Sequence, residues 1–442
     1  MSFNTNSKIV QIADSVHKYI SIPDKFYLEL IDTTEFQRLR RLGQLGGVPI
    51  SYPSATHSRF AHSLGAFHIA NRMITSLKHK HLDIVSQEDI DYVRIASLIH
   101  DIGHGPFSHM FEDIFTKFCK NEKNVKKFKP FQKHENITEQ IVLSDESEVG
   151  KILKDRGFNK RKIAHLIIGK EIEGKPFLNQ IIASQLDGDS IDYLMRDSLE
   201  TGVSYGLYNI DRLIAMLNIS KDGNIIVKEK GLQSVEQIVV ARYMQFARVY
   251  FHKTVRCWEF MVKTFIYELI KSEEEGIEIA LLPFLENFIK KPYWKTMLPL
   301  TDDTIYTQIQ LSALKEEKNK VLEDLAKRLL RRKLFKSIPI TKKTANKLLT
   351  NSDEIDRIIE KFNYPKEFWG IDSFYSRYYT PYEEKNRNAI LVKMKDGTVK
   401  QLSEVSEVVQ SLSKPKHNSL LICPEECKNE IIKKGIIESF EY

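Results

Sequence analysis

The strongest constraint on this chain is an apolar segment that ends in an imidazole and a carboxylate. Residues 96–99 read Ala-Ser-Leu-Ile and lead directly into His100 and Asp101. Two more histidines, His104 and His109, follow within the next eight residues. Burying an imidazole or a carboxylate without a partner costs several kcal/mol, and a bound cation supplies that partner. The segment therefore predicts a metal centre carried by helices.

Composition predicts a globular protein with one large core and a smaller appended domain. The chain has 442 residues, of which 42% are hydrophobic and 28% charged. We find no apolar run of about 18 residues and no signal peptide at the N-terminus, so we expect no membrane span and a cytoplasmic location. Four cysteines argue against a disulfide framework. We interpret the close pair Cys423 and Cys427 as small packing residues rather than metal ligands.

The net charge of +7 suggests an anionic partner, either nucleic acid or a smaller polyanion such as a nucleotide. Two segments concentrate the charge. Residues 117–133 contain seven lysines, and residues 327–336 contain Lys327, Arg328, Arg331, Arg332, Lys333 and Lys336. A solvated surface explains either segment equally well, so nucleic acid is an allowed partner rather than a required one.

Apolar spacing of three and four residues predicts helices over most of residues 25–375. The clearest stretches are 60–77, 90–99, 182–194, 235–269 and 304–334. Residues 224–228 resemble a short strand after a turn, and 389–402 resemble a hairpin around Asp396-Gly397. A third strand at 419–423 precedes a short helix ending near Gly435. We expect a large α-helical domain and then a small α+β region that begins between residues 340 and 380.

Three predicted helices bring together a set of metal-type ligands. His62 lies near the start of one helix, His100-Asp101 closes another, and Asp189 lies in a third. Two imidazoles and two carboxylates suit divalent Fe, Mn, Zn, Ni or Mg. Such a set leaves coordination positions open, where an ion can lower the pKa of water or polarise a phosphoryl oxygen. This chemistry is typical of a metal-dependent phosphohydrolase.

The third helix supports this interpretation. Asp189, Tyr193 and Arg196 are spaced so that they share one helix face. A face this acidic needs cations or solvent beside it. The alternative is a surface helix with internal salt bridges such as Asp192–Arg196.

The remaining histidines of interest are on turns or loops. His104 and His109 flank Gly105-Pro106, which breaks the helix. His134 follows the lysine-rich segment and precedes a glutamate, an arrangement suited to a general acid or a phosphate contact. The competing interpretation for each is a loop histidine without a role.

Three segments together resemble the HD-domain dNTP triphosphohydrolases. They are Thr-His57-Ser-Arg59-Phe-Ala-His62, the segment His100-Asp101-Ile-Gly-His104-Gly-Pro-Phe-Ser-His109, and the run from Asp189 to Asp197. The chain is most similar to the sterile-alpha-motif/HD-domain dNTPase and its bacterial dGTPase-like relatives. The resemblance runs from residue 31 to residue 336. It implies a mainly α fold with an HD-type helical catalytic domain over residues 1–340 and a C-terminal α+β region over 341–442.

The resemblance also implies roles for individual residues. The metal ligands would be His62, His100, Asp101 and Asp189. The catalytic residues would be Arg59, which contacts the triphosphate, and the active-site histidines His104, His109 and His134. Substrate contacts to phosphate, sugar and base would come from Gln44, Leu45, Arg59, Tyr193, Asp197, Arg242 and Tyr250.

Family members are activated by nucleotides bound between subunits, and matching positions here are Asp32, Gln37, Arg40, Arg332 and Lys336. The resemblance thus implies a GTP or dNTP activator and a homo-oligomer, most simply a tetramer. Arg and Lys from separate elements can clamp a triphosphate. The chain departs from the family pattern at Ala61, Ser190 and Phe251. These departures predict a phosphate grip that is weaker or borrowed from the lysine-rich segment, and an altered base preference.

The function predicted from the sequence is metal-dependent hydrolysis of dNTPs to deoxynucleoside and inorganic triphosphate. One alternative is an HD-type phosphohydrolase acting on monophosphates or cyclic nucleotides. The other is a nucleic-acid-binding regulator whose metal site only senses nucleotides. The basic pI of about 8.9 is the only support for the regulator.

Overall fold

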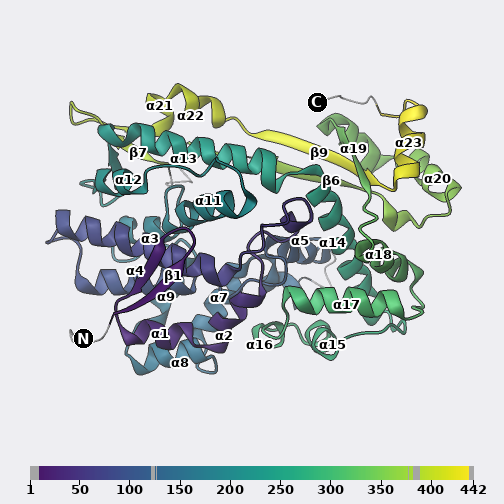
Figure 1. Ribbon diagram of the computed structural model, residues 1–442, viewed down its shortest axis with the longest axis horizontal. Helices are drawn as coiled ribbons and strands as arrows, with labels where there is room; N and C mark the ends of the chain where they lie inside the picture. Colours follow the sequence, from purple (N-terminus) through teal and green to yellow (C-terminus); the bar gives the residue numbers. More distant parts are fainter. Residues whose placement is uncertain (1–8, 121–124, 126, 377, 382–388, 438–442) are drawn as a thin grey trace.

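The computed structural model describes residues 9–120, 125, 127–376, 378–381 and 389–437. Part of the predicted lysine-rich segment, at 121–124 and 126, lies outside the described residues. Helices dominate and strands form three small sheets, which confirms the predicted fold class, mainly α with a small α+β C-terminal part (Figure 1).

Three helices form the centre of the molecule: α3 (Arg59–Lys80), α4 (Gln87–Ile99) and α11 (Gly188–Thr201). Helix α3 packs against both of the others. Its buried side chains are distributed around its circumference, as expected for a helix inside a core. Gly65 allows the closest approach, because a Cβ atom there would lie 1.9 Å from Asp192 Oδ1 on α11. The tight contact of α3 and α11 brings their N-terminal turns together.

Other helices, most of them shorter, surround this core. On the N-terminal side these are α1 (Lys25–Ile31), α2 (Thr34–Gln37), η1 (Arg38–Arg41), η2 (Val48–Ile50), α5 (His109–Phe118), η3 (Lys129–Gln132), α7 (His134–Leu143), α8 (Glu148–Asp155), α9 (Lys160–Ile167) and α10 (Pro176–Ile182). The following helices are α12 (Ile210–Met216), η4 (Glu229–Gly231), α13 (Leu232–Gln245), η5 (Phe246–Tyr250), α14 (Lys253–Glu274), α15 (Pro283–Lys290), α16 (Trp294–Met297), α17 (Asp302–Leu314) and α18 (Lys320–Leu330).

Three of the stretches predicted as helical are each divided in the structure. The stretch 182–194 is split because Asp187 caps a new helix, its side chain accepting from Ser190 N. The stretch 235–269 contains the π-helical turn η5, after which His252 caps α14. The stretch 304–334 is interrupted before Asn319, whose side chain accepts from the first amides of α18.

The strands form three sheets. The antiparallel hairpin of β1 (Val10–Asp14) and β2 (Lys18–Ile22) was not predicted. A second sheet has the order β3-β4-β7-β8, from β3 (Leu217–Ile219), β4 (Ile225–Lys228), β7 (Leu391–Lys393) and β8 (Val399–Gln401). The third has the order β5-β9-β6, from β5 (Lys336–Ile340), β6 (Gly370–Ser376) and β9 (Lys416–Cys423). The predicted strand at 224–228, the β7–β8 hairpin and the strand at 419–423 are confirmed.

The C-terminal segment is tied to the helical body by strand pairing. Strand β7 pairs in parallel with β4, and α22 (Glu407–Leu412) packs on α13. The long strand β9, yellow in Figure 1, then leads to α23 (Glu425–Lys433). The other elements of this segment are α19 (Lys342–Thr350), α20 (Asp353–Lys361), η6 (Lys366–Phe368) and α21 (Leu402–Val405). Strand β5 ends at Ile340, and the domain boundary placed there stays a prediction.

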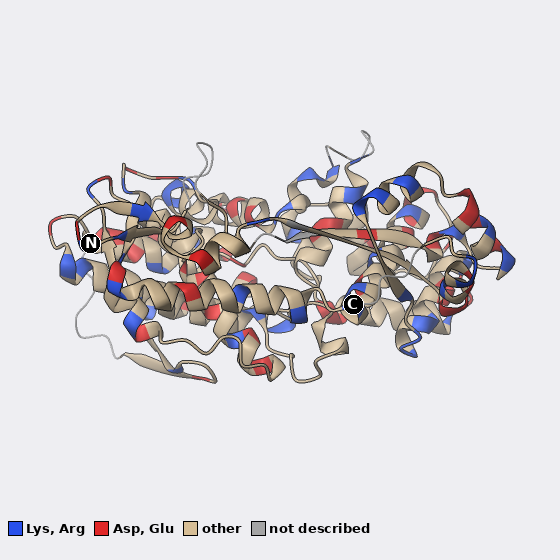
Figure 2. Ribbon diagram, turned by 90° about the horizontal axis from the view of Figure 1, so that it is seen from above, with Lys and Arg blue, Asp and Glu red and all other residues tan. Residues whose placement is uncertain are grey.

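Cys423 and Cys427 are free, fully buried thiols in a second apolar cluster under β5 and β9. In Figure 2 the basic and acidic positions of the described residues are interspersed along the length of the molecule. A search of the described helices finds none long and apolar enough to span a bilayer.

Candidate active site

The four residues predicted as metal ligands lie at the ends of the three central helices. His62 is in the first turn of α3, Asp189 is in the first turn of α11, and His100 and Asp101 directly follow α4. One ligand atom each of His62, His100 and Asp101 lie within 4.8 Å of one another. Asp189 Oδ1 lies 2.9 Å from His62 Nε2 and 3.8 Å from His100 Nε2. The structure thus gathers all four at one point.

Both imidazoles are held with Nε2 facing this point. His100 Nδ1 donates to the carbonyl oxygen of Ser97 at 2.8 Å, which leaves its Nε2 with a lone pair. His62 Nδ1 is 2.9 Å from Asp192 Oδ2. Both Nε2 atoms are buried, and among the described residues neither makes a well-aligned hydrogen bond, although the carboxylate of Asp189 lies beside both. A divalent cation would satisfy both atoms, so the residues present fit the predicted metal.

The electrostatics of the site agree with this fit. Burial lowers the pKa of His62, but the carboxylates of Asp189 and Asp192 outweigh it and raise that pKa to about 10. Burial raises the pKa of Asp101, but His100 and Arg59 hold it well below its usual range. The carboxylates therefore call for positive charge, which a cation would supply in place of a proton on the ring.

A second cluster lies beside the predicted metal ligands and contains the three remaining predicted histidines. His104 and His134 stack with ring centroids 3.6 Å apart, and His109 lies within 5.6 Å of His134 by the same measure. His104 Nε2 and His134 Nε2 lie 3.3 Å and 3.7 Å from Asp101 Oδ1. Asp101 thus joins the two clusters.

Glu112 orients this second cluster and was missed by the sequence analysis. Its Oε1 lies 2.8 Å from His134 Nδ1 and 3.2 Å from His109 Nδ1. The available signal was its spacing of three residues from His109 on α5, which puts both on one face. With Nδ1 bonded to Glu112, His134 presents Nε2 to the site.

Arg59, predicted to contact the triphosphate, is buried between the two clusters. Its Nη1 donates to Asp101 Oδ2 at 2.5 Å, and its Nε donates to Ser108 Oγ at 3.0 Å. These two hydrogen bonds fix a positive charge at the edge of the metal site.

The predicted sugar contacts form a separate polar group. Asp197 Oδ1 lies 2.8 Å from His57 Nε2, and Asp197 Oδ2 accepts from Tyr250 Oη at 2.5 Å. Gln245 Oε1 also lies within hydrogen-bond distance of Tyr250 Oη and is the alternative acceptor for its single proton. The π-helical turn η5 carries Tyr250, a kind of distortion that often occurs at functional sites. The roles of His57 and Gln245 were not predicted.

The other predicted substrate residues are near this group or on its borders. Leu45 and Tyr250 share a small apolar cluster, and Gln44 precedes Leu45 with its backbone amide bonded to His57 O at 3.0 Å. Tyr193 is half-buried on α11. Arg242 on α13 donates from Nη2 to Gln185 O at 2.9 Å.

The residues predicted to bind an activator fall into two groups. Gln37 Oε1 accepts from Arg40 Nε at 2.9 Å, and Asp32 is exposed at the end of α1 nearby in sequence. Arg332 donates to Ile50 O at 3.1 Å, and Lys336 Nζ lies 3.6 Å from Glu425 Oε2. Among the described residues no hydrogen bond or ion pair joins the two groups.

Two residues that the sequence analysis missed hold the site loops: Arg38 is buried, and Asp302 is partly buried. Arg38 donates from Nη1 to His104 O at 2.7 Å, and from Nε and Nη2 to Leu300 O. Asp302 accepts from Phe107 N at 2.7 Å and from Gly43 N at 2.8 Å. Asp302 therefore connects the loop that contains His104 and Phe107 to the loop that contains Gly43 and Gln44.

This connection through Asp302 predicts a pH dependence. Burial raises the pKa of Asp302 from 3.8 to about 6 in the folded protein. Because the folded state then binds the proton more tightly, this carboxyl should lower the free energy of unfolding as pH rises from about 4 to 6. Asp302→Asn should lose one amide hydrogen bond at every pH. It should also remove up to roughly 2 kcal/mol of the decrease in the free energy of unfolding with rising pH. Urea unfolding of the wild type and Asp302→Asn at pH 4.5 and pH 7 measures this difference. Equal changes in stability between the two pH values in both proteins would contradict the prediction.

Comparisons with known proteins identify the family of the chain. The HD domain family matches residues 59–184, and the HD associated region matches residues 209–282. The uncharacterized protein YwfO of Bacillus subtilis is 31% identical over 90% of this chain and 88% of its own. The deoxynucleoside triphosphate triphosphohydrolase SAMHD1 of Gallus gallus is 33% identical over 56% of this chain and 44% of its own.

A crystal structure of a phosphohydrolase from Bacteroides thetaiotaomicron superposes with a TM-score of 0.77 and 27% identity, covering 94% of this chain and all of that one. The matched HD domain contains His62, His100 and Asp101, and it ends five residues before Asp189. The sequence, the fold and the clustered ligands agree, and this chain belongs to the HD-domain phosphohydrolase family that includes relatives of the SAMHD1 dNTP triphosphohydrolases.

Proposed function

We propose that this protein is a metal-dependent triphosphohydrolase that converts a dNTP and water to deoxynucleoside and inorganic triphosphate. The observation that carries the proposal is the shared carboxylate of Asp101. It belongs to the proposed metal ligands, lies within 3.7 Å of His104 and of the candidate acid His134, and accepts from Arg59. A phosphate at this point would meet a cation, a guanidinium and a proton donor together.

The residues of the chain divide the work as follows. A divalent ion bound by His62, His100, Asp101 and Asp189 would lower the pKa of water and polarise a phosphoryl oxygen. Arg59 stabilises the negative charge that develops on the phosphate oxygens. His134, held at Nδ1 by Glu112, protonates the departing 5′ oxygen from Nε2, and His109 is the alternative acid.

Product analysis tests this function. We expect inorganic triphosphate to appear in step with deoxynucleoside when the protein is incubated with each dNTP and Mn²⁺ or Mg²⁺. Ion-exchange chromatography separates these products. Pyrophosphate with monophosphate, or orthophosphate with diphosphate, would show that a different bond is cut and would contradict the proposal.

The same purified protein also distinguishes the two alternative functions from the proposed one. A phosphohydrolase for monophosphates or cyclic nucleotides would release orthophosphate, or open the cyclic ester, with no activity on dNTPs. A nucleic-acid-binding regulator would bind oligonucleotides without turnover. The interspersed charges of Figure 2 favour a small anionic ligand over an extended nucleic-acid surface.

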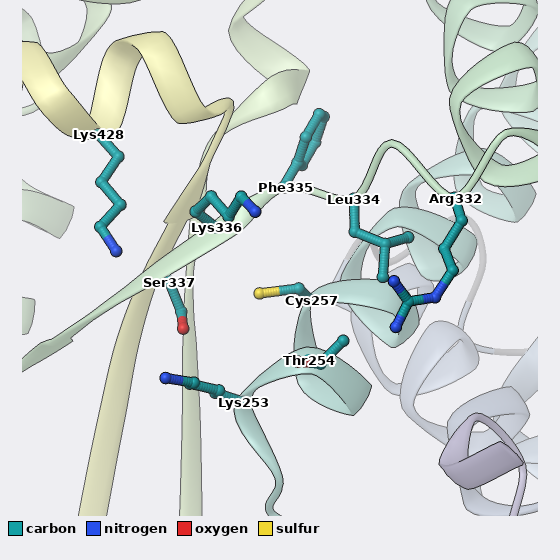
Figure 3. A pocket seen from close by; sticks show the side chains of 9 residues that line it. All are labelled: Lys253, Thr254, Cys257, Arg332, Leu334, Phe335, Lys336, Ser337 and Lys428. Atoms are coloured by element: carbon teal, nitrogen blue, oxygen red, sulfur yellow. The ribbon is translucent and has the colours of Figure 1, made fainter. Parts of the chain in front are cut away.

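We extend the proposal to activation by a nucleotide at a second, basic site. A cavity of about 300 Å³ lies between the start of α14, strand β5 and helix α23 (Figure 3). Four cations line it, from Lys253, Arg332, Lys336 and Lys428. Like charges gathered around a cavity repel one another, so a triphosphate there would be stabilising. Asp32, Gln37 and Arg40 would complete the site from a second subunit in a homotetramer.

The double variant Arg332→Glu/Lys336→Glu should therefore lose assembly promoted by nucleotide. We expect GTP or a dNTP to shift the wild type toward a tetramer in sedimentation velocity at micromolar concentration, and to leave the double variant unshifted. Lys333→Glu is the matched control, because Lys333 is exposed and does not line the cavity. A wild type that stays monomeric with nucleotide while fully active would refute the regulatory part alone.

A further inference from the structure

The turn of the N-terminal hairpin contacts Asp192, which holds the predicted metal ligand His62 on the side away from the metal position. His17, in the turn between β1 and β2, has a side chain only 3% exposed, and its Nε2 lies 2.6 Å from Asp192 Oδ1. Asp192 is fully buried, and its other oxygen bonds the ring of His62 at Nδ1. Two hydrogen bonds therefore connect His17 to Nδ1 of His62, the ring whose other nitrogen, Nε2, faces the metal position.

The carboxylate of Asp192 has no spare acceptor position. Besides the two histidines, Arg196 donates to it twice, from Nε to Oδ2 at 2.9 Å and from Nη2 to Oδ1 at 3.0 Å. Each oxygen thus has two partners, and an ionised carboxylate has about four lone-pair positions in all. Removing one of these hydrogen-bond donors leaves a buried acceptor position of Asp192 unpaired and allows its carboxylate to rotate.

A second contact fixes the hairpin on the same arginine. Asp14 Oδ2 accepts from Arg196 Nη1 at 2.9 Å, while Asp14 Oδ1 accepts from the backbone amides of Val16 and His17 at 3.0 and 2.8 Å. The carboxylate of Asp14 therefore shapes the turn and anchors it to α11. His17 is presented to Asp192 by a braced turn, so its position is set by the hairpin as a whole.

We propose that His17 is a positioning residue for the metal centre: it locks Asp192, and through Asp192 the ring of His62, so that the N-terminal hairpin determines how firmly the metal is held. The inference rests on the metal centre of the proposed function and concerns a residue outside the ligand set. Outer partners of metal-binding histidines typically change metal affinity by roughly 10- to 100-fold when removed.

A purely packing role is the competing explanation. The ring of His17 lies 4.9 Å from the ring of His68 on α3 and fills space beside it. A leucine would keep most of that volume but donate no hydrogen bond. A glutamine would keep a nitrogen donor at a similar reach, so the pair His17→Leu and His17→Gln separates packing from hydrogen bonding.

The test uses the full-length protein loaded with Co²⁺, whose visible absorption reports its ligands. We expect His17→Leu to alter that spectrum and to lose Co²⁺ to a chelator roughly 10 to 100 times faster than the wild type. His17→Gln should stay within a few-fold of the wild type in both measurements. Tyr19→Ser is the control on the same hairpin, because the side chain of Tyr19 points to solvent and is 61% exposed.

The outcomes are decisive in either direction. Equal Co²⁺ loss by the leucine and glutamine variants, or wild-type retention by both, overturns the inference. If the leucine variant unfolds, rescue by glutamine still supports it, and failure of a folded glutamine variant to retain Co²⁺ refutes it. His62→Ala separates failure of this inference from failure of the proposed function. If His62→Ala holds Co²⁺ as firmly as the wild type, the proposed metal centre is wrong, and the proposed function with it.

Discussion

Asp101→Ala is expected to abolish both bound metal and hydrolysis. Asp101 is one of four predicted ligands, and its carboxylate also lies 3.3 Å from His104 Nε2 and accepts from Arg59. Without it the other ligands cannot exclude water from a divalent ion, and the guanidinium loses its partner. We expect metal content to fall to background and the rate to fall by about three orders of magnitude or more. Elemental analysis and the product assay measure the two effects.

Two further variants make this result interpretable. Asp101→Asn keeps the shape of the side chain and should lose metal in the same way, which separates ligation from the destabilisation that a buried, unpaired Arg59 would cause. Asp145→Ala removes a carboxylate that is 58% exposed on the surface and should change neither quantity. Full activity in a folded Asp101→Ala protein would remove the basis of the proposed function.

Local signals predicted the elements whose chemistry is contained in a short segment. Helix α3 follows a serine cap whose side chain accepts from Ala61 N, and the predicted stretch 60–77 lies within it. The β7–β8 hairpin was predicted from Asp396-Gly397, and in the structure Gly397 has a positive φ of 89°, which glycine tolerates. Strand pairing between segments far apart in the chain could not be predicted from the sequence. The parallel pairing of β7 with β4 is an example.

The N-terminal hairpin was missed for a related reason. Its strands have five residues each, with a modest alternation of half-buried and exposed positions in β1. The turn places Lys18 at a φ of 64°, where glycine or asparagine is the usual signal. Short strands with an atypical turn residue carry little sequence information, and the hairpin is instead fixed by tertiary contacts of Asp14 and His17 with α11.

The site shows the same division between ligands and the residues that hold them. His62, His100 and Asp101 were identifiable because imidazoles and carboxylates are rare inside apolar helical segments. Glu112 and Asp302 resemble ordinary helix residues in the sequence, since acidic residues are common in a first helical turn. Their contacts join loops far apart in the chain, so only the fold reveals them.

The last prediction concerns the sugar. We expect the enzyme to prefer dNTPs over NTPs by roughly 100-fold or more, because a 2′-hydroxyl would clash with the residues beside Asp197 or be left unpaired. Both oxygens of Asp197 already have protein partners, His57 on one side and Tyr250 on the other. A 2′-hydroxyl brought beside Asp197 would meet these two side chains and compete with them for the carboxylate.

Tyr250→Phe should narrow the preference, since it frees Asp197 Oδ2 to accept from a 2′-hydroxyl while the ring still fills the apolar cluster around Leu45. The ratio of kcat/KM for dGTP to that for GTP measures the change, and Tyr293→Phe, at an exposed tyrosine, is the matched control. Equal wild-type rates on GTP and dGTP would defeat the preference itself. An unchanged ratio in Tyr250→Phe would show that the wild-type preference arises elsewhere, because the acceptor freed on Asp197 would then not face the 2′ position.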